Sequence, residues 1–153
     1  MPDYVDFSKP LRIAGITART TNSREYNPAT ASLPALWGRF YSAKPTSSNP
    51  ARKNDGVYSV YTEYESDVNG AYTVVIGRER SDPTAEKVVT VPAGRYLEFT
   101  STGAMPAAVV NGWKQVWSYF AELKAPKRSY TTDFEYYDPS DPSTVKIYIA
   151  VSR

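Results

Sequence analysis

Residues 57–80 read VYSVYTEYESDVNGAYTVVIGRER, and this stretch sets the fold class. Val57 to Glu65 is rich in tyrosine, which is typical of a β-strand. Asp67-Val68-Asn69-Gly70 predicts a tight turn, because an Asn-Gly pair adopts positive φ at low cost. Tyr72 to Arg80 has the composition of the returning strand. The stretch therefore predicts an antiparallel hairpin.

A strand and a helix are expected before this hairpin. Arg12 to Thr20 favours a strand, and the polar run Asn22 to Ala29 favours a loop. A helix is predicted to begin at Ser32, a good N-cap residue, with Pro34 in its first turn. Gly38 lies inside it at a cost of about 1 kcal/mol relative to alanine, which indicates a close approach by a strand or ligand. The apolar residues at helical spacing are Leu33, Leu36, Trp37 and Phe40.

The same order of elements recurs after a polar loop at Lys44 to Asp55 and the hairpin. Val88 to Phe99 favours a long strand, and its interruption at Pro92-Ala93-Gly94 indicates a bulge or an edge position. A second helix follows Pro106, and the strands Asp133 to Tyr137 and Val145 to Val151 come after it. Its apolar stripe consists of Val109, Trp113, Val116, Trp117 and Phe120.

The order is therefore β-α-β-β twice, which indicates an internal duplication with halves at approximately 9–82 and 86–151. Several residue pairs support it. Ala14-Gly15 recurs as Ala93-Gly94, and Trp37 with Phe40 recurs at nearly the same offset as Trp117 with Phe120. The remaining matches share a second, slightly shorter offset: Tyr61 with Phe134, Tyr64 with Tyr137 and Ile76 with Ile149.

Composition excludes several classes of function. The 153 residues are 41% hydrophobic and 22% charged, as expected for one globular domain over 1–153. The net charge of +2 gives no electrostatic footprint for nucleic acid. The chain has no cysteine and no histidine, which excludes disulfides, the usual Cys/His metal sites and His-dependent nucleophiles. Acid–base chemistry would depend on Asp, Glu, Tyr or Lys, and no cofactor is expected.

The chain also lacks targeting features. Its first six residues carry two acids, and no stretch approaches the roughly 18 apolar residues of a membrane span. We therefore expect a soluble, cytoplasmic protein without a membrane partner.

Seven short segments then stand in a characteristic order and spacing. In that order they resemble the GyrI-like effector-binding domain, over roughly residues 9–151. This module senses ligands in bacterial multidrug-responsive transcription activators, and it also occurs alone on gene cassettes. The segments are Leu33 to Phe40, Gly56 to Tyr61, Tyr72 to Gly77, Val91 to Tyr96, Trp113 to Trp117, Asp133 to Tyr137 and Ile147 to Val151.

The resemblance implies an α+β fold. Two tandem duplicated βαββ modules would be related by a pseudo-two-fold, with antiparallel sheets forming a ligand cleft. Members bind lipophilic, often cationic, small molecules, whose charge meets a carboxylate within a Phe-Glu-x-Tyr pattern. Here the matching residue is Glu135. The regulators carry a DNA-binding module before this domain, and the chain has no room for one, which argues against a direct role in transcription.

Glu135 and Tyr137 share one face of their predicted strand, because side chains alternate. Without the resemblance, Glu135 would be an exposed carboxylate paired with Lys or Arg, and the tryptophans would be core residues. Tyr58 and Tyr61 point to different faces, so at most one faces the ligand squarely. The predicted ligand-binding residues are Glu135, Trp37, Tyr58, Tyr61, Trp113, Trp117, Tyr137 and Tyr148, with no catalytic or metal residue.

Three functions are compatible with this cleft. The first is a non-catalytic binding protein for hydrophobic or cationic small molecules. The second is a hydrolase of reactive electrophiles that uses the same carboxylate as a general base. The third, by analogy alone, is a protein that interacts with gyrase or with a transcription regulator.

Overall fold

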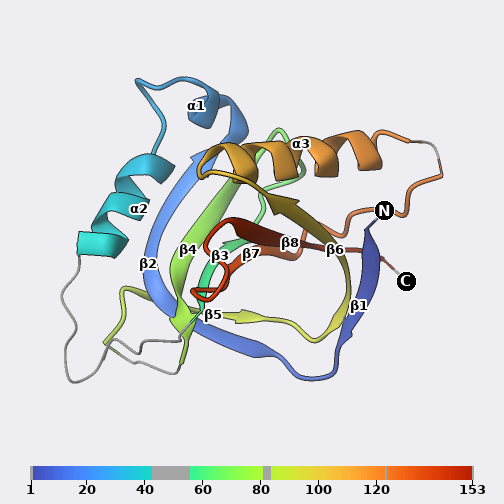
Figure 1. Ribbon diagram of the computed structural model, residues 1–153, viewed down its shortest axis with the longest axis horizontal. Helices are drawn as coiled ribbons and strands as arrows, with labels where there is room; N and C mark the ends of the chain where they lie inside the picture. The colour runs from blue at the N-terminus through green and yellow to red at the C-terminus, as the bar shows by residue number, and fades with distance from the viewer. Residues whose placement is uncertain (1, 43–55, 81–83, 123, 153) are drawn as a thin grey trace.

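The computed structural model describes residues 2–42, 56–80, 84–122 and 124–152. Its strands form one antiparallel sheet of eight, in the order β1-β6-β8-β7-β3-β4-β2-β5, which curls into a half-barrel (Figure 1). The predicted loop at 44–55 lies outside the described residues. The strands are β1 Asp3–Phe7, β2 Leu11–Thr21, β3 Val57–Thr62, β4 Ala71–Glu79, β5 Lys87–Val91, β6 Gly94–Thr102, β7 Thr132–Tyr137 and β8 Thr144–Ala150.

The sheet confirms the α+β duplication. Strands β2-β4-β3 form one half and β6-β8-β7 the other, and the pairing of β3 with β7 joins them. Helix α2 (Leu33–Ser42) packs on β2 and β4, and α3 (Ala107–Phe120) packs on β6 and β8. The helices therefore cover the outer strands of each half, and the central strands β3 and β7 lie between them.

The two edge strands differ in part from the sequence prediction. The sequence analysis missed β1, and the predicted strand at 88–99 is two strands, because the chain breaks at Pro92-Ala93 and resumes at Gly94 with φ 144°. Strand β1 pairs with β6 and β5 pairs with β2, so the leading strand of each half completes the sheet of the other half.

The observed packing corrects several residue matches of the duplication. Tyr61 packs with the cluster beneath α2, whereas Phe134 packs in the cluster on the opposite face of the sheet. The match of Tyr61 with Phe134 is therefore wrong, because a shift by an odd number of positions exchanges the two faces of a strand. Tyr61 corresponds instead to Tyr137, and Trp37 to Trp113 at the same offset (137 − 61 = 113 − 37), because Trp37 packs on Tyr137 as Trp113 packs on Tyr61. The matches of Trp37 with Trp117 and of Tyr64 with Tyr137 are therefore wrong as well.

The segment before α2 also differs from expectation. Residues predicted as loop form a short helix, α1 (Asn22–Tyr26), whose N-cap Thr21 accepts a hydrogen bond from the Arg24 amide at 3.1 Å. Ser32 directly precedes α2, but its amide and that of Leu33 donate to the Glu25 carboxylate at 2.9 and 3.0 Å. A carboxylate from α1 thus satisfies the first amides of α2, which fixes the two helices relative to each other.

The glycines give a stability test. Gly15 pairs with Gly77 across β2 and β4, and a Cβ on Gly15 would lie 2.0 Å from the Ile76 carbonyl oxygen. Gly38 has open space around its Cβ position among the described residues, so a close approach by a strand there is wrong.

We expect Gly15→Ala to lower the free energy of unfolding by about 1–3 kcal/mol, because the backbone must shift. Gly38→Ala is its control and should raise this free energy by up to about 1 kcal/mol through helix propensity. Urea denaturation of both variants measures the difference. Equal effects at the two sites would show that β2 and β4 do not approach as closely as described.

Candidate functional site

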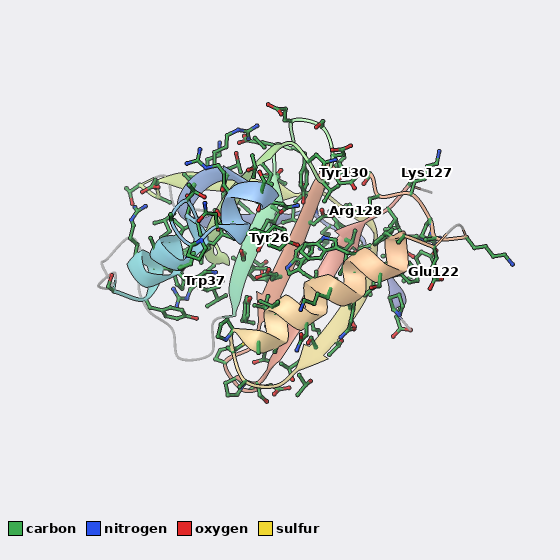
Figure 2. All side chains as sticks on the ribbon, turned by 90° about the horizontal axis from the view of Figure 1, so that it is seen from above. Tyr26, Trp37, Glu122, Lys127, Arg128 and Tyr130 are labelled. Atoms are coloured by element: carbon green, nitrogen blue, oxygen red, sulfur yellow. The ribbon has the colours of Figure 1, made fainter. Side chains whose placement is uncertain are left out.

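A cavity of about 690 Å³ opens between the helices, above the central strands. Figure 2 shows α2, with Trp37, and α3 on the same face of the sheet, with strands visible between them. Residues from α1, α2, α3, β3, β4 and β7 line the cavity, and most of its wall is apolar. Its volume lies within the range of about 300–1,000 Å³ that small-molecule sites occupy.

Glu135 lies on the central strand β7, on the face that carries the cavity. Its side chain is only 2% exposed, yet it lines the cavity. The Tyr137 hydroxyl donates to its Oε1, and the Tyr61 hydroxyl and Trp113 Nε1 donate to its Oε2, each at 2.6 Å. Burial raises the pKa of Glu135, and the three hydrogen bonds act in the opposite direction. The site therefore holds a carboxylate away from water, supported by neutral donors.

The donors keep their protons. Burial, followed by the charge of Glu135, raises the pKa of Tyr61 and of Tyr137 far above that of a free phenol. Both hydroxyls are therefore donors throughout the physiological pH range. Because no Lys or Arg neutralises Glu135 in the contacts described, its charge is available to a group that enters the cavity.

Aromatic rings form the walls on both sides of this carboxylate. Trp37 packs edge-on to Tyr137 and Trp113 packs edge-on to Tyr61, each with ring centroids 5.3 Å apart. Trp117 continues the wall along α3, 6.2 Å from Trp113. Ring faces of this kind attract cations by about 0.5–2 kcal/mol each.

A second buried charge lies beside the cavity. Asp133 is fully buried, accepts the Ala150 amide and a hydrogen bond from Tyr64, and pairs with Arg128 at 2.8 Å. Arg128 lines the cavity wall. The sequence analysis missed this pair, although Asp133 stands two residues before Glu135 and must share its strand face. Asp133 therefore has a cationic partner, whereas the contacts described for Glu135 are all with neutral donors.

Six of the eight predicted ligand-binding residues line the cavity: Glu135, Trp37, Tyr61, Trp113, Trp117 and Tyr137. Tyr58 and Tyr148 do not, and both instead pack against Phe134 on the opposite face of the sheet. Tyr58 is an odd number of residues from Tyr61, and Tyr148 is paired directly across from Phe134. Alternation along β3 and the register of β8 thus direct both side chains away. Sequence analysis also missed Glu25, which lines the cavity as well.

Two searches of the described residues were negative. No helix there is long and apolar enough to cross a membrane. No group of three or more acidic or other metal-ligating side chains comes together within those same ranges.

Comparison with known proteins identifies the family of this chain. Its residues 8–151 match the profile of Cass2, described as an integron-associated effector binding protein. The chain belongs to this family. A solved integron cassette protein of Vibrio cholerae is 38% identical, with a TM-score of 0.84 over 99% of this chain and 95% of its own. The curated protein YobU of Bacillus subtilis (strain 168), named as a candidate transcriptional regulator, is 31% identical over 93% of this chain and 92% of its own.

More distant solved structures share the fold. SAV2435, solved bound to tetraphenylphosphonium, is 21% identical with a TM-score of 0.68 over 99% of this chain and 94% of its own. A protein from Staphylococcus aureus MU50, named as a candidate transcription regulation protein, is 19% identical with a TM-score of 0.72 over 100% of this chain and 99% of its own. The Cass2 family name itself supports the binding of a small-molecule effector.

The raised pKa of Glu135 predicts a pH dependence of stability. In the unfolded chain Glu135 loses its proton around its ordinary pKa of 4.5, whereas in the folded state it keeps the proton to a higher pH. The unfolding free energy of the wild type should therefore fall relative to that of Glu135→Gln as pH rises from 4.5 through the raised pKa. Below and above this window the difference should be flat. Denaturation at several pH values measures it, and a difference that rises with pH would contradict the net effect of burial.

Loss of the positive charge in the Arg128–Asp133 pair should lower the stability of the fold strongly. Arg128→Met should lower the unfolding free energy by about 3–5 kcal/mol, since it leaves a buried carboxylate uncompensated. Arg39, which pairs with Glu86 at 2.7 Å while 56% exposed, supplies the control. Arg39→Met should cost less than about 1 kcal/mol. Thermal or urea unfolding compares them, and similar small losses would mean that Asp133 is not sealed from water.

Proposed function

We propose that this protein binds lipophilic cations in the cavity between α2 and α3, with Glu135 as the counter-charge, in the manner of GyrI-like domains. The observation that carries the proposal is a carboxylate 2% exposed on the floor of an aromatic cavity. Neutral donors hold it in place, and its charge lacks a cationic side chain among the contacts described.

The free-energy cost of removing the Glu135 carboxylate from water arises during folding, before any ligand binds. A cation that enters the cavity then interacts with a charge that solvent screens poorly. The ligand loses its own hydration, which a lipophilic cation with a diffuse charge holds weakly. The faces of the tryptophan and tyrosine rings add to the attraction.

Such a site need not select one compound. Ring faces and a single charge impose few directional hydrogen bonds, so ligands of different shape can be accommodated. That is the property expected of multidrug binding. The tetraphenylphosphonium named with SAV2435 is a ligand of this chemistry, and that protein shares the fold of this chain.

The same carboxylate favours a second candidate, hydrolysis of an electrophile. Its raised pKa and its position between two phenols are features that a general base requires. Product formation distinguishes the two functions. A hydrolase releases altered ligand at a rate that Glu135→Gln abolishes, whereas a binding protein returns the ligand unchanged.

Calorimetric titration with methyltriphenylphosphonium tests the proposal, with neutral triphenylphosphine oxide as the matched ligand. Glu135→Gln should weaken binding of the cation by at least about tenfold and leave the neutral ligand unaffected, since a tenfold change needs about 1.4 kcal/mol.

Glu122→Gln is the matched control, because Glu122 is exposed and lies beyond the end of α3, away from Trp37 (Figure 2). It should bind both ligands as the wild type does. Equal cation affinity in Glu135→Gln and the wild type would refute the proposed role of Glu135.

A further inference from the structure

The cavity walls consist of two aromatic pairs that are related by the duplication. Trp37 of the first half packs on Tyr137 of the second, with 80° between the rings, and Trp113 of the second packs on Tyr61 of the first, with 73°. The centroid distance is 5.3 Å in both. Each pair is thus made by a helix of one half and a central strand of the other.

The carboxylate lies between these two pairs. Tyr137 donates to one oxygen of Glu135 and Tyr61 donates to the other, both at 2.6 Å. Glu135 is paired directly across from Ser59 in the register of β3 and β7, and the two are related by the same offset as Tyr61 and Tyr137 (135 − 59 = 137 − 61). The pseudo-two-fold therefore passes between Glu135 and Ser59, and the first half carries a small hydroxyl where the second carries the charge.

The cavity thus offers one negative charge near its axis and two similar aromatic walls, one on each side. A ligand with a charged centre and a single flat arm can use one wall at a time. A ligand with two flat arms that diverge from its charged centre can contact both walls while its charge stays at Glu135. The axis carries a buried carboxylate on one side only, while both sides have an aromatic wall, because the two halves share Trp and Tyr at these positions but not Glu.

We propose that the preferred ligands are cations whose charged centre carries two flat apolar arms, with one arm seated on Trp37 and Tyr137 and the other on Trp113 and Tyr61. The proposal rests on the proposed function and adds the shape class of the ligand. Trp37 is then a specificity residue for the second arm, whereas Trp113 also donates to Glu135 and acts on the charge itself.

The test compares dibenzyldimethylammonium, with two arms, and benzyltrimethylammonium, with one, by calorimetric titration. Trp37→Leu should weaken binding of the two-armed cation about tenfold, because one ring of the ligand loses its aromatic contact and is no longer buried. It should weaken binding of the one-armed cation no more than about twofold. The second aromatic wall remains, so the single arm loses only one of its two alternative positions. Trp37→Phe, which retains a ring and perturbs α2 less, should lie between Leu and the wild type.

Tyr4→Leu is the control, since Tyr4 is 55% exposed on edge strand β1, and it should bind both cations as the wild type does. An equal loss of both cations in Trp37→Leu, or none for either, overturns the two-arm proposal while leaving cation binding intact. Neutral dibenzyl ketone separates the two claims. If it binds as tightly as the two-armed cation, and Glu135→Gln changes neither, the proposed function itself fails.

Discussion

The antiparallel pairing of β3 with β7 is the contact on which the rest of the structure depends. It joins the two halves into one sheet, and its register sets Glu135 across from Ser59 at the point where the halves meet. Because each helix covers the outer strands of its own half, the central pair has a space above it rather than a helix on it. The cavity is thus a consequence of joining two like modules edge to edge. The exchanged edge strands β1 and β5 strengthen this union, since each completes the sheet of the other half.

The charge at this junction is tolerated because the surrounding donors are neutral and fixed. Two phenols and an indole satisfy the Glu135 oxygens without neutralising them, whereas Arg128 neutralises its neighbour Asp133. Two carboxylates on one strand face therefore differ in their partners: Asp133 has a basic one, and Glu135 has neutral donors, which is why we propose Glu135 as the counter-charge of a ligand. The contrast follows from which partners the fold brings to each, since both are almost completely removed from water.

Much of this was predictable from the sequence. The hairpin pattern, the two helical stripes and the repeat of element order predict the α+β duplication, and strand alternation places Glu135 with Tyr137. The turn of the hairpin differs from its prediction, because positive φ occurs at Glu63 and not at Asn69 or Gly70. Other features depend on long-range pairing that local patterns do not encode. Tyr148 is directed away from the cavity by its partner Phe134, and the carboxylate at the start of α2 comes from Glu25 in a segment without helical periodicity. The match of Tyr61 with Phe134 was misleading, because abundant aromatics resemble one another on either face of a strand.

A crystal structure of the complex with methyltriphenylphosphonium tests the central claim most directly. Glu135 is buried, whereas Asp67 is exposed and the Glu25 carboxylate already accepts the amides of Ser32 and Leu33. The phosphorus should therefore lie closer to the Glu135 carboxylate than to that of Glu25 or Asp67, which also line the cavity. Its phenyl rings should contact Trp37 and Trp113. A cation seated at the rim or outside the cavity, with the hydrogen bonds of Glu135 undisturbed and its surroundings dry, would contradict the role assigned to this buried carboxylate.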